Sequence, residues 1–161
     1  MNEIKITPLG TVSPYPKYNA NCPGFLIEYN NKKILLDSGN GITRLLKFPE
    51  HLNNLNVIIT HYHKDHFADI GSIQYASYVY HNLGLLKEKV NIFLPKNDFN
   101  YNKKSIIENK ESYCNYIDII DKYNYNIGGL KITFEDNKSH TIESFMVKLE
   151  CNNKKMYIHQ I

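Results

Sequence analysis

Short apolar runs alternate with polar, Asn- and Lys-rich segments along most of the chain. A β-branched run closed by Pro and Gly at 4–10 predicts a first strand, and the Pro-rich stretch 11–24 predicts a loop. Two apolar runs flank residues 30–33, which predicts a β-hairpin whose second strand delivers Asp37 at its end. The run at 55–60 is almost continuously apolar, so we expect a strand that is buried on both faces.

Helical spacing of apolar residues occurs twice. It predicts a short helix in 39–48 and a longer one in 70–89. The expected buried residues are Ile42, Leu45 and Leu46 in the first helix, and Ile73, Ala76, Val79, Tyr80 and Leu83 in the second. Residues 96–115 are polar and show no clear period. Strands are expected at 90–95, 116–121, 130–136, 144–150 and 155–161, so the chain is predicted to be of the α/β class.

Length and composition favour a single domain that spans residues 1–161. The formal net charge is +3, and the basic residues are not concentrated as in a typical nucleic-acid-binding patch. No apolar run has the ~18 residues that a membrane span needs, and the N-terminus lacks the features of a signal peptide, so a cytoplasmic protein is expected. Three widely spaced cysteines, Cys22, Cys114 and Cys151, fit reduced thiols.

Metal-binding chemistry is concentrated in "THYHKDHFAD", residues 60–69, directly after the apolar strand. His61 and His63 lie two residues apart, so an extended backbone would point both imidazoles to one face and let them bind one ion. Asp65 and His66 follow, and a backbone that curves into a helix would aim both at a second ion nearby. Ligands of this type, without thiolates, suit Zn, Mn or Fe in an open hydrolytic site. His51 and His81 are expected to be solvated.

The same segment resembles the HxHxDH signature of the metallo-β-lactamase fold. "PLGT", "LLDSGNG" and "HFADIGSIQYA" are similar to the ribonuclease Z-like and phosphodiesterase-like branch of that superfamily. The resemblance implies an αβ/βα sandwich in which His61, His63 and a later histidine bind one metal, while Asp65 and His66 help bind the second. His140 stands where the later histidine is expected. The resemblance implies that Asp37 supports the site through hydrogen bonds. An aspartate at the end of a strand is also typical of a simple turn, so both interpretations stay open.

The function that this resemblance implies is metal-dependent phosphodiester hydrolysis by a metal-activated water, with Asp65 orienting the water and handling its proton. Expected substrates are RNA ends or small molecules such as cyclic nucleotides. Hydrolysis of thioesters, lactones or β-lactams is the less favoured use of the fold.

The C-terminal sequence departs from the family pattern. A strand in family members ends in a metal-bridging Asp, and the corresponding position here is Gln160. No counterpart of the family's final histidine follows, so we expect a C-terminally truncated chain whose second β-layer is incomplete. An uncovered layer would favour a homo-oligomer or another partner. The alternative function is a non-catalytic metal-binding or interaction module derived from such a hydrolase.

Overall fold

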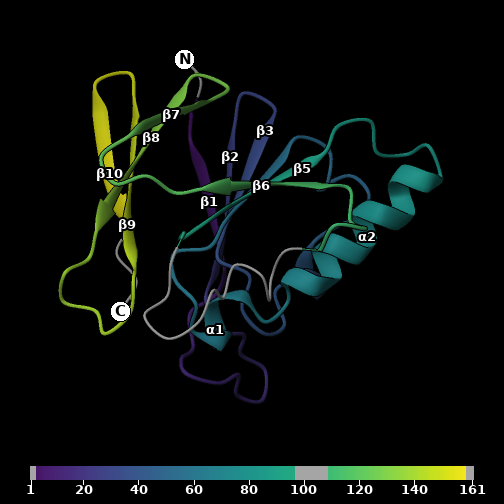
Figure 1. Ribbon diagram of the computed structural model, residues 1–161, viewed down its shortest axis with the longest axis horizontal. Helices are drawn as coiled ribbons and strands as arrows, with labels where there is room; N and C mark the ends of the chain where they lie inside the picture. Colours follow the sequence, from purple (N-terminus) through teal and green to yellow (C-terminus); the bar gives the residue numbers. More distant parts are fainter. Residues whose placement is uncertain (1–2, 97–108, 159–161) are drawn as a thin grey trace.

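The chain forms two stacked β-sheets in a computed structural model that describes residues 3–96 and 109–158 (Figure 1). Six strands form the first sheet in the order β1-β2-β3-β4-β5-β6, and four form the second in the order β10-β9-β8-β7. The second sheet lies on one side of the first, and helix α2 (Ile70–Asn82) lies on the other (Figure 1). This layering confirms the predicted α/β sandwich.

The first sheet changes from antiparallel to parallel at β3. β1 pairs with β2 and β2 with β3 in antiparallel fashion, whereas β3, β4, β5 and β6 run parallel. The strands are β1 Lys5–Gly10, β2 Gly24–Tyr29, β3 Lys32–Leu36, β4 Leu55–Ile58, β5 Val90–Leu94 and β6 Cys114–Asp118. The carboxyl ends of β3, β4 and β5 therefore meet at one edge of the sheet, which is where ligand sites of α/β sheets commonly lie.

Two hydrophobic cores sandwich the parallel strands. Alternate residues of β3, β4 and β5 point to opposite faces because successive side chains of a strand alternate. Leu35, Val57 and Ile92 pack on the α2 side. Their neighbours Leu36, Ile58 and Phe93 pack against the second sheet. All four residues of β4 are buried, which confirms the prediction of a strand covered on both faces.

The predicted hairpin is present between β2 and β3. Its turn residues Asn30 and Asn31 both have positive φ angles, 47° and 60°. Two such residues in succession make the turn that suits the twist of paired strands, and asparagine tolerates this conformation.

The second sheet is fully antiparallel. Its strands are β7 Asn124–Ile127, β8 Leu130–Asp136, β9 Phe145–Cys151 and β10 Lys154–Ile158. β7 was not predicted, because its sequence NYNI is short and half polar. It pairs with β8 across a turn at Gly128 and Gly129, both of which have positive φ. The expectation for 96–115 falls largely on residues outside the described ranges.

The first predicted helix is only a 3-10 turn, η1, at Thr43–Leu45. Leu46 already has an extended backbone with ψ 135°, and a proline follows at 49. Ile42 and Leu46 are buried as expected, but Leu45 is 44% exposed, so its predicted burial is wrong.

The predicted buried face of the second helix is partly wrong. α2 ends at Asn82, and its buried residues are Ile70, Ile73, Gln74 and Ser77, whereas Leu83 is 63% exposed. Gln74 can be buried because its amide donates a hydrogen bond to the Tyr116 hydroxyl (2.9 Å). Ser77 donates to the Gln74 carbonyl (2.7 Å). The buried face of α2 therefore includes two polar residues that the apolar pattern does not mark, because Gln74 has a partner on β6 and Ser77 has one within the helix.

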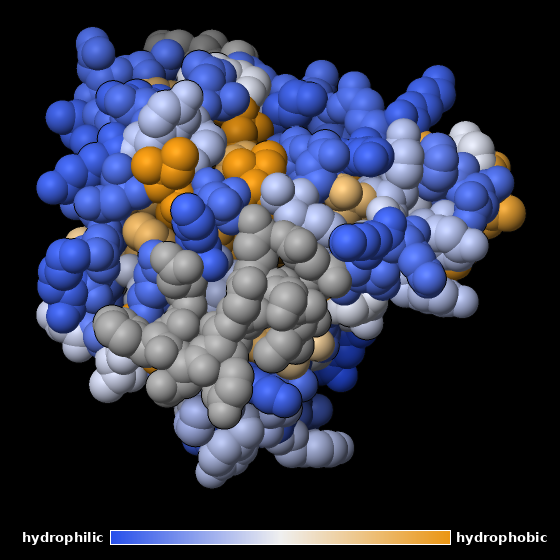
Figure 2. All heavy atoms as spheres, in the orientation of Figure 1, coloured by the Kyte–Doolittle hydropathy of each residue, from blue (hydrophilic) through white to orange (hydrophobic). Residues whose placement is uncertain are grey.

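The surface is mostly polar, as the Asn- and Lys-rich sequence predicts. Figure 2 shows a face that is mostly hydrophilic, with apolar side chains in a few patches. Cys22, Cys114 and Cys151 are free thiols, as predicted. Within residues 3–96 and 109–158, no helix combines the length and the apolar character needed to cross a bilayer.

Candidate metal centre

The predicted site residues converge at the carboxyl edge of the first sheet. Asp37 directly follows β3, and His61 follows the end of β4 after two further residues. The chain then turns into the short helix α1 (Lys64–Phe67), which carries Asp65 and His66. Strand ends and one helical turn thus bring these four residues together from two segments of the sequence.

Asp37 is fully buried at the centre of a hydrogen-bond network. Its Oδ1 accepts from the Thr60 backbone N–H (2.8 Å), and its Oδ2 accepts from the Thr60 hydroxyl (2.8 Å). Oδ2 also lies 2.6 Å from His66 Nδ1. Burial raises the pKa of Asp37, while the bonds from His66 and Thr60 oppose the rise. The φ of 58° at Asp37 turns the chain out of β3, in a conformation that aspartate tolerates.

This network fixes the protonation of two imidazoles. The Thr60 hydroxyl has a single proton, which it donates to Asp37, so we assign the proton shared between Thr60 and His61 to His61 Nδ1, 3.0 Å away. The same logic places a proton on His66 Nδ1, because the Asp37 carboxylate only accepts. The Nε2 atoms of His61 and His66 therefore keep their lone pairs, as metal-binding imidazoles require.

His61 Nε2 is buried and makes no hydrogen bond. A buried polar atom without a hydrogen bond lowers the stability of the fold by about 1–3 kcal/mol, and a bound ligand would remove this penalty. Burial lowers the pKa of His61 to about 2, with further contributions from His66, His63 and His140. A neutral imidazole with an unshared lone pair fits a cation and not an anion.

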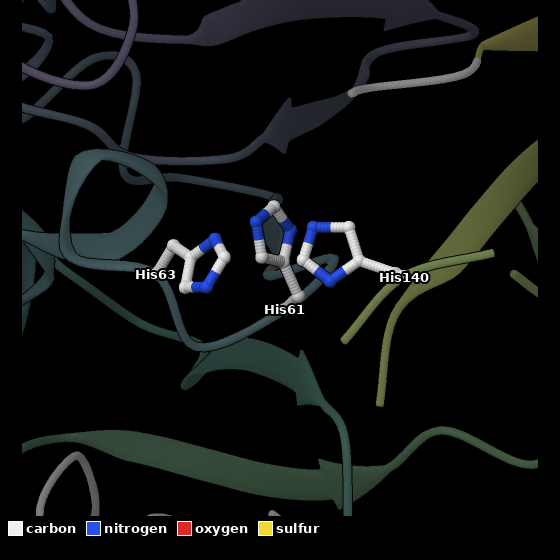
Figure 3. A group of neighbouring side chains, drawn as sticks. All are labelled: His61, His63 and His140. Carbon is white, nitrogen blue, oxygen red and sulfur yellow. The ribbon is translucent and has the colours of Figure 1, made fainter. Parts of the chain in front are cut away.

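Three imidazoles surround one position (Figure 3). Ligand atoms of His61, His63 and His140 all lie within 4.8 Å of one another, the one such group found in the described ranges. The ring centroids are 4.8 Å apart for His61 and His63, and 4.7 Å for His61 and His140. Three imidazoles are a sufficient protein donor set for a catalytic zinc.

His140 reaches this group from the loop between β8 and β9, on the second sheet. An isolated antiparallel bridge joins His61 to Ser144, and the Phe145 N–H donates to the Thr60 carbonyl (3.1 Å). These contacts hold the loop against the end of β4. The structure thus places His140 beside His61 and His63.

Asp65 and His66 lie next to the three imidazoles. The His61 and His66 ring centroids are 4.0 Å apart, and His66 Nε2 lies 3.6 Å from Asp65 Oδ2. Both of these facing atoms are acceptors under the assignment above, so a second cation between them would relieve their repulsion. Ser13 donates a hydrogen bond to Asp65 Oδ2 (2.6 Å), which orients the carboxylate.

Sequence reasoning missed Ser13 and Thr60. Ser13 belongs to the Pro-rich loop, far from Asp65 in sequence, and no spacing signals its contact. Thr60 could have been noticed, because a hydroxyl residue directly before the first histidine is placed to bond the aspartate of a neighbouring strand end.

A cavity of about 370 Å³ opens beside these groups. It is lined by Ser13, Pro14, His63, Lys64, Asp65 and His66.

Of the other predicted positions, Gln160 lies outside the described residues. His51 does not join the site and accepts a hydrogen bond from the Lys47 backbone (3.1 Å). His81 is exposed, as expected, and stacks on Tyr113 with centroids 3.5 Å apart.

The lowered pKa of His61 predicts acid sensitivity of the metal-free chain. Unfolded His61 binds a proton near pH ~6.5, whereas the folded residue does not, so stability falls as pH decreases below that value, by up to about 1.4 kcal/mol per pH unit. Urea unfolding of chelated protein from about pH 7 to 5.5 measures this slope. The slope should become shallower in His61→Ala and stay unchanged in the matched surface variant His81→Ala. Equal slopes in all three proteins would contradict the assignment.

Sequence comparison with known proteins finds relatives that match part of their length to this chain. No family model matches the chain. The probable metallo-hydrolase YhfI of Bacillus subtilis is 33% identical over 82 residues, which cover 50% of this chain and 34% of that protein. Ribonuclease Z of Saccharolobus solfataricus is 32% identical over 149 residues, which cover 88% of this chain and 47% of that protein. The chain thus spans less than half the length of these relatives.

Solved structures extend the similarity to the whole described fold. The crystal structure of the metallo-β-lactamase fold protein YhfI matches with a TM-score of 0.84 at 23% identity, covering 96% of this chain and 61% of that one. The short form of human tRNase Z matches with a TM-score of 0.65 at 16% identity, covering 98% of this chain and 68% of that one. With the two-sheet topology, these similarities show that the chain has the metallo-β-lactamase fold, and its sequence is similar to a probable metallo-hydrolase and to ribonuclease Z.

Proposed function

We propose that this chain is a metal-dependent hydrolase that cleaves phosphodiesters. The observation that carries the proposal is the buried Nε2 of His61, which makes no hydrogen bond and belongs to a residue clustered with His63 and His140. Of the three histidines, His63 also lines the cavity. His61, His63 and His140 would hold one cation, and Asp65 and His66 would hold a second. Imidazole and carboxylate donors accept Zn, Mn or Fe. Cys22 lies in the core and burial raises its pKa, so it does not compete as a thiolate ligand.

A divalent cation in this site would acidify water and polarise a phosphoryl oxygen. The chain's own residues supply the rest. Ser13 holds one oxygen of Asp65, which leaves the other to orient the attacking water and accept its proton. Thr60 and His66 both donate hydrogen bonds to Asp37, which fixes the His66 ring that lies beside Asp65. Pre-set side chains need no reorganisation during the reaction.

Two features support a phosphodiester substrate. Lys64 lines the cavity and offers a positive charge to a phosphate. Relatives that carry the name ribonuclease Z match across as much as 88% of the chain. RNA or a small phosphodiester is therefore the proposed substrate. The cytoplasmic location and self-association predicted from the sequence remain predictions.

The proposal predicts metal-dependent turnover of bis(p-nitrophenyl) phosphate. Chelated chain should be inactive, and reloading with Zn, Mn or Fe should restore turnover, with bound metal counted by elemental analysis. A chromogenic lactam serves as the competing substrate, and lactam turnover without diester turnover would refute the substrate class. If metal raises the melting temperature but neither substrate is turned over, the chain alone is a metal-binding module and the hydrolytic proposal fails for it.

A further inference from the structure

Two highly exposed tyrosines belong to the loop that forms part of the candidate site. Tyr18 is 95% exposed and Tyr15 is 66% exposed. Both belong to the loop that contributes Ser13 and Pro14 to the wall of the cavity. Tyr15 directly follows Pro14, so its backbone lies next to the cavity wall. Aromatic rings that contribute so little to the core are available to bind a ligand.

The loop that carries these rings is fixed to the protein at several points. The Val12 N–H donates to the Asn21 carbonyl (3.0 Å), and the Ala20 N–H donates to the Lys17 carbonyl (3.0 Å), so the loop folds back on itself. Asn19 makes the turn with a φ of 62°. The base of the loop is held by Asn21, whose side chain donates to the Leu9 carbonyl (2.9 Å) and accepts from Arg44 (2.7 Å). The hydrogen bond from Ser13 to Asp65 adds a link to the site itself.

The exposed charged side chains on and beside this loop are cationic, whereas the carboxylate of Asp65 that Ser13 contacts is buried in the cavity wall. Between residues 11 and 24 the only charged side chain is Lys17, which stands between the two tyrosines in sequence. Exposed Arg44 lies at the base of the loop, and Lys64 lies in the cavity wall. Exposed aromatic rings interleaved with cations match an unpaired nucleic-acid strand, whose bases stack on the rings while its phosphates meet the cations.

We propose that the loop 13–20 is a base-stacking subsite, in which Tyr15 and Tyr18 hold unpaired RNA bases that flank the phosphodiester in the cavity. This rests on the proposed function and extends it from phosphodiesters in general to single-stranded RNA. Lys17 contributes attraction to the backbone. Because every base has a stacking face, the subsite selects an unpaired strand without selecting a base.

The test is binding of a fluorescein-labelled, nuclease-resistant phosphorothioate oligouridylate to the metal-loaded chain, followed by fluorescence anisotropy. The double variant Tyr15→Ala/Tyr18→Ala should weaken binding by at least about thirtyfold, since each lost stacked base costs about fivefold or more and the two factors multiply. Tyr15→Phe/Tyr18→Phe should retain affinity, because stacking needs the ring and not the hydroxyl. Tyr75→Ala is the matched control, since Tyr75 is also exposed (70%) but lies on α2.

An abasic phosphorothioate strand of the same length separates stacking from charge. It should bind the wild type and the double alanine variant equally, because it presents phosphates without bases. The proposal is overturned if the alanine variant binds oligouridylate as tightly as the wild type, or if its affinity for the abasic strand falls by the same factor. Binding needs no turnover, so Tyr-dependent RNA binding without diester hydrolysis would refute the proposed function alone.

Discussion

Replacing Asp37 with alanine is expected to lower the free energy of unfolding by about 2–5 kcal/mol. The change leaves three donors without their acceptor, namely the Thr60 N–H, the Thr60 hydroxyl and His66 Nδ1, all within a fully buried site. It also places alanine at a φ of 58°, which adds strain. Urea denaturation of the metal-free chain measures the loss.

Two variants control this experiment. Asp37→Asn keeps the volume and tolerates the left-handed backbone, so it isolates the lost carboxylate oxygen and should be less destabilising than alanine. Asp121→Ala removes an exposed carboxylate that accepts the Asp136 N–H (2.9 Å), and it should cost less than either Asp37 variant. If Asp37→Ala unfolds at the same urea concentration as Asp121→Ala, the network does not stabilise the fold as described.

Replacing His61 with alanine is expected to weaken zinc binding by more than about a hundredfold. Loss of a residue that merely orients a ligand already costs about 10- to 100-fold in metal affinity, and His61 is the most buried of the three clustered imidazoles. Competition with a chromophoric chelator gives the affinity, and elemental analysis gives the metal content after gel filtration. Diester turnover should fall with the lost metal.

His81→Ala is the matched control for this change, because it removes a histidine that stacks on Tyr113 outside the cluster. It should bind zinc like the wild type. His140→Ala should also lose zinc, since His140 is the ligand from the second sheet. Wild-type affinity in both His61→Ala and His140→Ala would show that zinc binds elsewhere.

Much of the candidate site could be predicted because its residues are local in sequence. His61, His63, Asp65 and His66 fall within one strand end and one helical turn, so their spacing alone brings them together. Asp37 could be placed because it ends a recognisable strand that pairs with β4. His140 could not be placed from spacing, since its position depends on how the second sheet stacks, and only the family resemblance indicated it. The Ser13 contact needs the tertiary fold.

The strands were predicted better than the helices for a physical reason. Burial on both faces gives β4 a continuous apolar run, which is readable from sequence. The buried face of α2 is decided partly by Gln74 and Ser77, whose burial depends on the hydroxyl of Tyr116 and on helix carbonyls. β7 escaped prediction because an edge strand of polar residues owes its conformation to its neighbour β8.

The three imidazoles also have a mechanical meaning, because they come from different layers of the sandwich. His61 and His63 follow the first sheet, and His140 belongs to a loop of the second. A cation held by all three would act as a clasp between the layers at this edge, where the backbone contacts of His61 with Ser144 and of Thr60 with Phe145 already join them. Sliding one sheet over the other would then break a coordination bond, so a bound cation would also resist shear between the sheets.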